Sequence, residues 1–436
     1  MKSRKITLIA LLSVIFFSCS QEKIVELPLT VQNGYGPFVA GLGGFAPNAE
    51  DENNPWYKTY LKVLKSPENL TDTKYGHIET NIFQSIYQDY LLGNITDEWY
   101  EELQRNSIFD TLNLSKIPVK TKIAFVLGKD SDGTLKMAID ANSNLDLSDD
   151  DLFIPLEMNS FDWSKEDSLA KVYAINVSFE TFVHNKVAPV SAPLFIVCNS
   201  QDNSFMCNFL QYSTAKFKGE QIAVSSNNFT NLSYNDIGLF LVPNNLKNGE
   251  KVKREAIYRK NEYVEIKDEI YKILGVNTDK NVLVLEKTDS PKLQLFSTQI
   301  GYKAYPFQGE ELTSKATISL ESLKGKYVLL DFWAEWCGPC IGEFPHLKEL
   351  YSKTNREKFE IIGVAGISSF GGVKKLIDKH ELTWNQIMSD DINKIIETYG
   401  INSYPTTLLL DAEGIIIAKD LRGDKLEEKV LSLISE

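Results

Sequence analysis

The feature that most constrains the fold is a cysteine pair placed where an apolar strand ends and a helix begins. The stretch VLLDFWAEWCGPCIGEF, residues 328–344, carries Cys337 and Cys340 with only Gly and Pro between them. The run VLLDFW is apolar without alternation, which is typical of a fully buried strand. The residues after it are typical of a helix, and Pro339 suits the first helical turn because its missing N–H costs nothing there.

The two thiols occupy positions suited to thiol-disulfide exchange. A helix N-terminus carries partial positive charge and free N–H groups, and both stabilise a thiolate. Cys337 lies at the tip of the expected helix and should attack, while Cys340, one turn further in, should resolve the mixed disulfide. The competing interpretation is half of a zinc site, which needs a second ligand pair. The four histidines of the chain show no such spacing, so we expect no metal.

From about residue 292 to the C-terminus, strand-like and helix-like segments alternate. The strand-like segments are YVLLDFW, FEIIGVAGI, TTLLLD and GIIIAK, and the helix-like segments are CIGEFPHLKELYSK, GGVKKLIDKHE, INKIIETYG and LEEKVLSLIS. This alternation is typical of α/β folds.

The segment DFWAEWCGPC resembles the active site of thioredoxin, and its surroundings resemble the TlpA/ResA-like thiol-disulfide oxidoreductases. The matching residues are Gly325-Lys326 before the first strand, Glu343 and Pro345 after the cysteines, and the later stretch YGINSYPTTLLLDAEG. The resemblance covers residues 292–436 and gives no information about the rest of the chain. It implies an α/β thioredoxin fold and a redox-active disulfide, Cys337-Cys340, with no other cofactor.

The same resemblance assigns a substrate-binding role to three residues. Pro405 matches a cis-proline that faces the cysteines and leaves the neighbouring backbone, at Tyr404, free to pair with a substrate segment. A cis X–Pro bond is a minority state, so a committed one usually has a purpose. Trp336 would flank the substrate groove. The competing interpretations are an ordinary turn at Pro405 and plain packing of Trp336.

Two acidic residues accompany the cysteines. Asp331 lies in the apolar run, where a carboxylate is costly to bury without a partner. By resemblance it lies behind Cys340 and exchanges protons with it. Glu343 matches the buried acid of the ResA-like branch, although a helical Glu is more often a solvated surface residue. If both acids are buried beside Cys340, they should titrate as a coupled pair, with one of them protonated near neutral pH.

The N-terminus has the pattern of an export signal. Basic residues precede an apolar run, residues 6–17, which is too short to span a bilayer. A small residue followed by Cys19 resembles the lipobox of bacterial lipoproteins, in which the cysteine carries the lipid. We therefore expect a signal peptide at 1–18, a lipidated tether or loop at 19–54, and a lipid-anchored protein of the cell envelope facing the periplasm. The competing interpretation is ordinary signal cleavage nearby.

The middle of the chain divides into a helical segment, 55–110, and a β-rich domain, 111–291. In the first, HIETNIFQSIYQDYLLG has apolar residues at helical spacing, and TDEWYEELQ predicts a second helix with Thr96 as N-cap. In the second, strand and hairpin patterns dominate. Two stretches that begin at residues 138 and 223 each show a strand, an Asn-rich loop and an apolar exit strand, which indicates a duplicated β unit.

Two features of this β-rich domain leave alternatives open. The loop DANSNLDLSDDD, residues 140–151, has oxygen-bearing side chains at the spacing of an EF-hand calcium loop, but Leu145 stands where that motif requires Gly. A calcium site and a plain Asn/Asp-rich turn are both compatible with it. Cys198 and Cys207 flank an Asp-Asn pair; a two-residue turn there would oppose them for a disulfide, and the alternative is two buried free thiols.

The charge composition of the chain excludes one class of binding partner. A net charge of −13 argues against a nucleic-acid partner.

We expect an envelope enzyme that reduces the disulfides of exported client proteins and is anchored to the membrane by lipid. Its electrons would come from a membrane electron donor, because the chain has no NADPH or flavin domain. The Gly-Pro dipeptide between the cysteines favours reduction over oxidation. The rival class is an envelope binding lipoprotein whose β-rich region recognises a partner, with the thioredoxin domain accessory.

Overall fold

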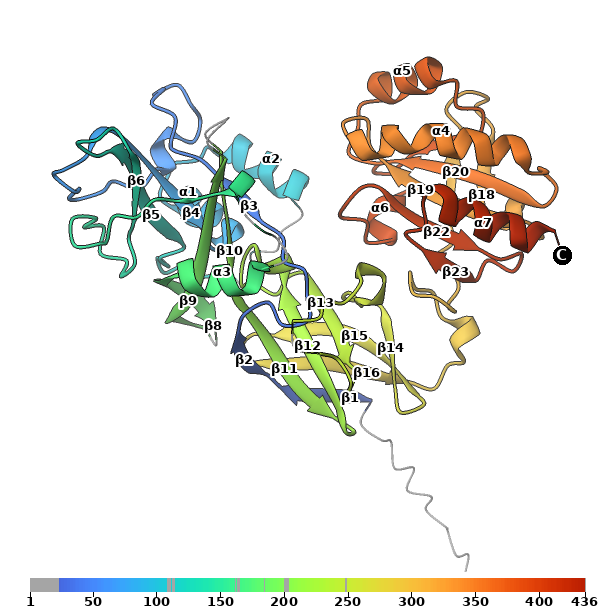
Figure 1. The fold of residues 1–436 in the computed structure, drawn as a ribbon, viewed down its shortest axis with the longest axis horizontal. Helices are drawn as coiled ribbons and strands as arrows, with labels where there is room; N and C mark the ends of the chain where they lie inside the picture. Colours follow the sequence, from blue (N-terminus) through green and yellow to red (C-terminus); the bar gives the residue numbers. More distant parts are fainter. Residues whose placement is uncertain are drawn as a thin grey trace, which may run out of the picture.

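The computed structural model describes residues 23–435, apart from 108–110, 112–113, 161, 163–164, 184, 200–203 and 248. The expected signal peptide and Cys19 therefore lie outside the described residues. The chain forms two β-sandwiches followed by an α/β body, which lie along the molecule in Figure 1. Among the described residues, no helix is long and apolar enough to cross a membrane.

The first sandwich packs a five-stranded sheet against a three-stranded sheet. The larger sheet has the order β3 (Gly43–Phe45), β10 (Ser204–Phe209), β9 (Lys186–Asn199), β7 (Leu156–Glu157), with β8 (Ile175–Val183) also paired to β9. The smaller sheet has the order β4 (Thr71–Glu79), β5 (Lys122–Lys129), β6 (Leu135–Ile139). Apolar side chains from both sheets, such as Phe125 and Phe209, form one buried cluster between them.

Three helices belong to this first part: α1 (Ile82–Leu91), α2 (Asp97–Ser107) and α3 (Glu166–Tyr173). The Thr96 hydroxyl accepts a hydrogen bond from the Trp99 amide at 3.3 Å, which confirms the expected N-cap of α2. The helical segment expected at 55–110 is only partly helical, because β4 occupies its middle and pairs with β5. Burial alternates in this strand, with Gly76 and Ile78 buried, so Ile78 follows a strand period rather than the helical one.

The second sandwich contains the strands that follow in the chain and two strands from the N-terminal segment. One sheet has the order β1 (Ile24–Pro28), β16 (Val282–Thr288), β15 (Glu269–Asn277), β14 (Tyr263–Ile266), and the other has the order β13 (Ile237–Val242), β12 (Glu220–Ser226), β11 (Gln211–Phe217), β2 (Thr30–Asn33). Their inner faces share one apolar cluster, to which Leu27 and Leu29 contribute. The expectation of a tether at 19–54 is thus wrong for residues 24–33. This segment contributes β1, which pairs with β16, and β2, which pairs with β11.

The duplicated β unit stays a prediction. After β6, the chain returns at Phe153 through one isolated antiparallel bridge to Met137. After β12, the corresponding return is the full strand β13, paired over residues 237–242. Both copies therefore run strand, loop and antiparallel return, but they differ in the length of the returning strand.

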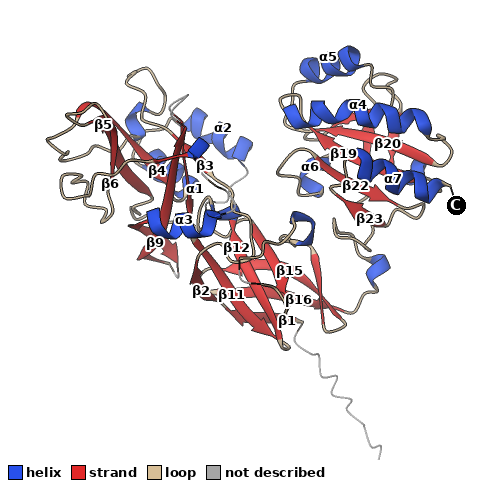
Figure 2. Ribbon diagram, viewed as in Figure 1, coloured by secondary structure: helices blue, strands red, loops and turns tan. Residues whose placement is uncertain are grey.

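The C-terminal body, residues 292–435, is built on one mixed sheet. Its order is β21 (Asn385–Met388), β20 (Phe359–Ala365), β19 (Tyr327–Trp333), β22 (Thr406–Leu410), β23 (Ile416–Lys419). The strands β21, β20 and β19 pair in parallel, β22 pairs antiparallel with β19, and β23 pairs antiparallel with β22. Its helices are α4 (Gly338–Lys353), α5 (Phe370–His380), α6 (Ile395–Thr398) and α7 (Gly423–Ile434), and β17 (Gln308–Glu310) and β18 (Thr317–Ser319) form a separate hairpin. Figure 2 shows these helices covering the sheet, in contrast to the β-dominated remainder.

The period of two along β19 decides which side chains meet the cysteines. Leu329 and Trp333 point to the face covered by α4, α5 and α7, while Leu330 and Phe332 point to the opposite face, toward α6. Asp331 shares the parity of Leu329 and Trp333, so it points to the face that carries the cysteine-bearing helix. The α/β expectation for this part of the chain is confirmed, and β21 and the β17–β18 hairpin are the elements that sequence patterns missed.

Candidate active site

The cysteine pair lies at the N-terminus of α4. Cys337 is the N-cap residue, and its sulfur accepts a hydrogen bond from the Cys340 amide at 3.2 Å. The two sulfurs are bonded as a disulfide, with 5.3 Å between the Cα atoms. Both residues are buried, at 4% and 2% exposure. Because orphan N–H groups of the helix point at Cys337, a thiolate formed on reduction is stabilised there rather than on Cys340.

The proline loop has the cis peptide bond that the resemblance implies and lies beside Trp336. The Tyr404–Pro405 peptide bond is cis. The Tyr404 ring packs edge-on against the Trp336 indole with 5.7 Å between ring centroids, which places the loop beside the residue that precedes Cys337. Burial raises the pKa of Tyr404 to about 12, and its hydroxyl has no hydrogen-bond partner within the described part of the chain.

An exposed apolar surface surrounds the disulfide. Trp336 is 62% exposed and donates its indole N–H to the Ile367 carbonyl at 2.8 Å. Ile367 and Phe370 are exposed as well, at 72% and 52%. The competing interpretation of Trp336 as a packed core residue is therefore wrong. Large apolar side chains left in water beside a reactive site are typical of a protein-binding surface.

The two acids differ in their surroundings. Burial and, to a smaller extent, the nearby Glu343 charge raise the pKa of Asp331, Arg422 lowers it, and the net result is a pKa of about 7. Glu343 accepts a hydrogen bond from the Gly423 amide at 2.6 Å and lies 3.5 Å from His346 Nδ1. Its side chain is only 16% exposed, so it is not an ordinary solvated helical Glu. These polar contacts are with Gly423 and His346, and the proximity of Glu343 to Cys340 stays a prediction.

Arg422 is the site residue that sequence patterns missed. It precedes α7, and its guanidinium donates a hydrogen bond to the Pro405 carbonyl at 2.6 Å. It also supplies the positive charge that opposes the raised pKa of Asp331. One guanidinium thus connects the cis-proline loop to the buried acid. The sequence offered only an indirect signal for this residue. A carboxylate inside an apolar strand, such as Asp331, requires an opposite charge from another element of the fold.

Two features of the β-rich domain take no part in this site. Asp140 accepts hydrogen bonds from the amides of Asn144 and Leu145, both at 3.0 Å, so its oxygens hold the loop backbone. No group of three His, Cys, Asp or Glu side chains suited to a metal occurs among the described residues. Leu145 adopts a positive φ of 62° without being Gly. These contacts describe an Asn/Asp-rich turn held by its own side chains, and calcium binding at this loop stays a prediction.

Cys198 and Cys207 are buried free thiols, which is the second of the two alternatives that the sequence left open. The β9–β10 register pairs Cys198 with Phe205 and Cys207 with Ile196, so the cysteines are offset along the strands. Burial raises the pKa of Cys198 to about 11 and that of Cys207 to about 12. Both thiols are therefore protonated at neutral pH and poorly nucleophilic.

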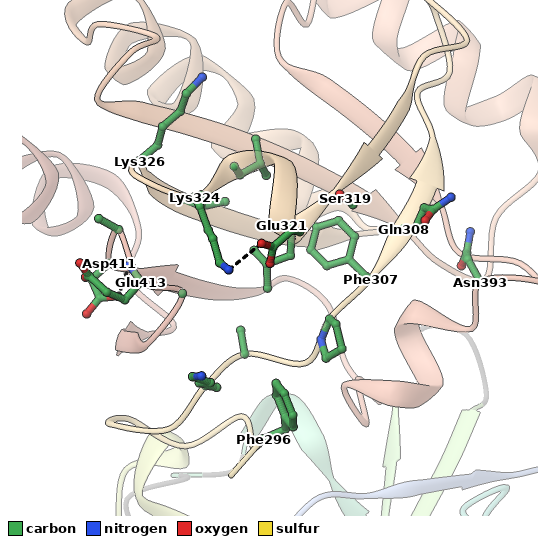
Figure 3. A pocket seen from close by; sticks show the side chains of 18 of the residues that line it. Phe296, Phe307, Gln308, Ser319, Glu321, Lys324, Lys326, Asn393, Asp411 and Glu413 are labelled. Atoms are coloured by element: carbon green, nitrogen blue, oxygen red, sulfur yellow. Dashed lines mark hydrogen bonds and ion pairs between the residues drawn. The ribbon is translucent and has the colours of Figure 1, made fainter. Parts of the chain in front are cut away.

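A cavity of about 750 Å³ lies at the other end of the C-terminal sheet (Figure 3). It is lined by Val328 at the start of β19 and by residues 411–414 of the β22–β23 hairpin, whereas the cysteines follow the end of β19. An ion pair of 2.6 Å joins Lys324 to Glu321 at its rim. The cavity is remote from the thiol chemistry.

A cysteine pair at a helix N-cap, a cis-proline loop beside Trp336 and a buried acid on the adjoining strand define a thioredoxin-type thiol-disulfide exchange protein. The comparisons agree: the AhpC/TSA family model matches residues 300–419. The thiol-disulfide oxidoreductase ResA of Bacillus anthracis is 36% identical over 132 residues, 30% of this chain and 75% of that protein. The thioredoxin-like protein YneN of Bacillus subtilis is 36% identical over 121 residues, 27% of this chain and 69% of that protein.

Among solved structures, the thioredoxin domain of a thiol-disulfide oxidoreductase from Bacteroides vulgatus is 36% identical, covering 31% of this chain and 97% of that chain, with a TM-score of 0.29. The chain belongs to the ResA-like thiol-disulfide oxidoreductases, through its C-terminal body. Proteins of this kind work through a redox-active cysteine pair, which here is Cys337 and Cys340.

Proposed function

We propose that this oxidoreductase reduces disulfides of exported proteins in the cell envelope. The observation that carries the proposal is the position of the disulfide: the Cys337 sulfur caps α4 and lies beside a cis-proline loop and an exposed apolar surface. In the reduced protein, such a sulfur is a stabilised thiolate.

The exchange takes two steps. The Cys337 thiolate attacks one sulfur of the client disulfide; a mixed disulfide forms, and the other client sulfur leaves as a thiolate and takes up a proton. Cys340 then loses its proton, attacks the Cys337 sulfur, and releases the second client sulfur as a thiol. The client gains two electrons and two protons, and the protein is left with the Cys337–Cys340 disulfide.

Asp331 is the group suited to move the Cys340 proton. It lies on the face of β19 that α4 covers, and its pKa of about 7 lets it change charge near neutral pH. A general base is most effective when its pKa lies near the working pH. Arg422 keeps that pKa from rising further, so its role is to tune the base rather than to touch the sulfur.

The location and the electron source are parts of the same proposal. The basic and apolar N-terminal pattern supports export, and Cys19 supports a lipid anchor that holds the protein on the periplasmic side. After each cycle the disulfide must be reduced again, and the described residues form two β-sandwiches and one α/β body without a separate nucleotide-binding domain. A membrane electron donor is therefore the expected partner. Exported proteins whose thiols must stay reduced are the expected clients.

Trapping tests the proposal. In the full chain, Cys340→Ala leaves the mixed disulfide unresolved, so clients should remain covalently bound to Cys337 and be recovered from the envelope fraction. Cys337→Ala is the matched control and should recover none of them. If both variants recover the same proteins, the captured species do not report disulfide exchange and the proposal fails.

The second candidate is an envelope binding protein whose two sandwiches recognise a partner. The observation that favours it is the size of these sandwiches, which extend from β1 to β16 and carry no catalytic group that we could identify among their described residues. Reduction of insulin disulfides by the full chain separates the two candidates. Activity that disappears in Cys337→Ala supports the reductase, and its absence in the wild type supports the binding protein.

A further inference from the structure

The second sandwich contacts the proline loop of the active site. Arg254, in the segment between β13 and β14, donates hydrogen bonds to the Ser403 hydroxyl and, at 3.3 Å, to the Thr406 hydroxyl. Asn402 donates a hydrogen bond to Asp236 at 3.2 Å. These contacts lie on both sides of the cis peptide bond that precedes Pro405. Figure 1 shows the β13–β14 segment reaching toward α6 and β22 of the C-terminal body.

A cavity of about 550 Å³ lies between the two parts at this contact. The sandwich contributes Val39, Asn228, Asp236, Arg254 and Arg259, and the proline loop contributes Asn402 and Ser403. Its volume falls within the range of about 300–1,000 Å³ that is usual for ligand sites. The cavity also connects to the chemistry, since Ser403 precedes Tyr404, whose ring contacts Trp336 next to Cys337.

The two arginines that line this cavity differ in their charged partners. Arg259 forms an ion pair with Asp236 at 3.3 Å. Arg254 forms no ion pair within the described residues; its hydrogen bonds go to two neutral hydroxyl groups, and the Asp420 carboxylate acts on it only from a longer distance. An arginine fork binds a carboxylate through parallel N–H donors far better than it binds hydroxyl groups. Arg254 is exposed, so a carboxylate brought by a bound molecule can reach it.

We propose that the second sandwich forms one wall of the client site, and that Arg254 binds an acidic side chain of an extended client segment near the cysteine under attack. The inference rests on the proposed reductase function and names the class of its client. A segment paired with the Tyr404 backbone continues past Ser403 into the cavity. Its carboxylate replaces the hydroxyl partners of Arg254 and orders the client before Cys337 attacks.

The test uses single-turnover reduction of disulfide peptides by the pre-reduced full chain. The peptides carry Glu, Gln or Lys at successive positions around one cysteine. At one or more positions, the Glu peptide should react about tenfold faster than the Gln peptide, as expected for a hydrogen bond to a charged group. Arg254→Gln should remove this difference, and Arg254→Glu should instead favour the Lys peptide. Lys253→Gln removes the neighbouring exposed charge and should leave the preference for Glu intact.

A small aromatic disulfide without a peptide separates this inference from the reductase function. The wild type should reduce it, and each peptide rate is divided by the rate of the same variant on this small disulfide, so that any effect of Arg254 on the proline loop itself cancels. If the wild type fails to reduce it, the reductase function is wrong. If the small disulfide is reduced but no peptide position shows a preference that depends on Arg254, the client site does not extend onto the sandwich and this inference is overturned.

Discussion

Replacing Asp331 with Asn should change how the stability of the C-terminal body depends on pH. The folded-state pKa of Asp331 is about 7, against an ordinary value of 3.8. Between these two values the folded chain holds a proton that the unfolded chain has lost, so stability falls as the pH rises through this window and is level above it. The difference between the two pKa values corresponds to about 4 kcal/mol, at about 1.36 kcal/mol for each unit. The asparagine side chain of the variant cannot ionise, so the variant does not lose stability in this pH window.

The measurement is urea unfolding of the oxidised full chain at several pH values between 5.5 and 8. A short protease pulse at each urea concentration, with detection of the C-terminal fragment, reports the unfolding of that body alone. The variant should gain about 2 kcal/mol over the wild type between pH 5.5 and pH 7, and the gain should stop growing above pH 7. Other titrating groups cancel in the difference between the two proteins.

The reasoning would be refuted by a difference in unfolding free energy that stays constant over this pH range. Asp331 would then have the same charge in the folded and unfolded chain near neutral pH. It could not serve as the group that takes the Cys340 proton there. Loss of disulfide exchange in the variant without this pH signature would indicate a packing effect instead.

Three further substitutions test the surroundings of the site and the anchor. Arg422→Gln leaves the Pro405 carbonyl without its donor, which should cost about 1–3 kcal/mol of stability, and it should move the pH dependence of Asp331 upward in the same unfolding assay. Glu343→Gln removes a charge that raises the pKa of Asp331, so the pH–rate profile of disulfide exchange should move to lower pH; an unchanged profile contradicts the coupling. Cys19→Ser should release the protein from membranes into the soluble exported fraction, and a variant that still sediments, with no acyl mass on the wild type, contradicts the lipid anchor.

The chemistry of the C-terminal body could be predicted because its signals are local in the sequence. The cysteine pair, the strand before it and the helix after it are contiguous, so Cys337 becomes an N-cap by its position alone. The segment containing Pro405 carries a recognisable pattern as well. Arg422 was missed because its role depends on where α7 begins relative to β19, which is a tertiary property.

The β-rich part was predicted less well because its pairings are distant in sequence or depend on an exact register. Residues 24–28 form β1 only by pairing with β16 near residue 285, and no local pattern reports such a partner. The offset of Cys198 from Cys207 follows from the β9–β10 register, which the turn composition did not determine. The contact of Arg254 with Ser403 joins two separately folded parts and has no sequence signature.

The pairing of β1 with β16 limits how far the enzyme can move from a membrane. If Cys19 carries the lipid, the first strand begins only five positions after the anchor, at Ile24. Five residues can extend over about 17 Å at most, whereas a flexible leash reaching residue 54 would extend over roughly 120 Å. The second sandwich is then held at the bilayer surface, and clients would have to come to the membrane to be reduced.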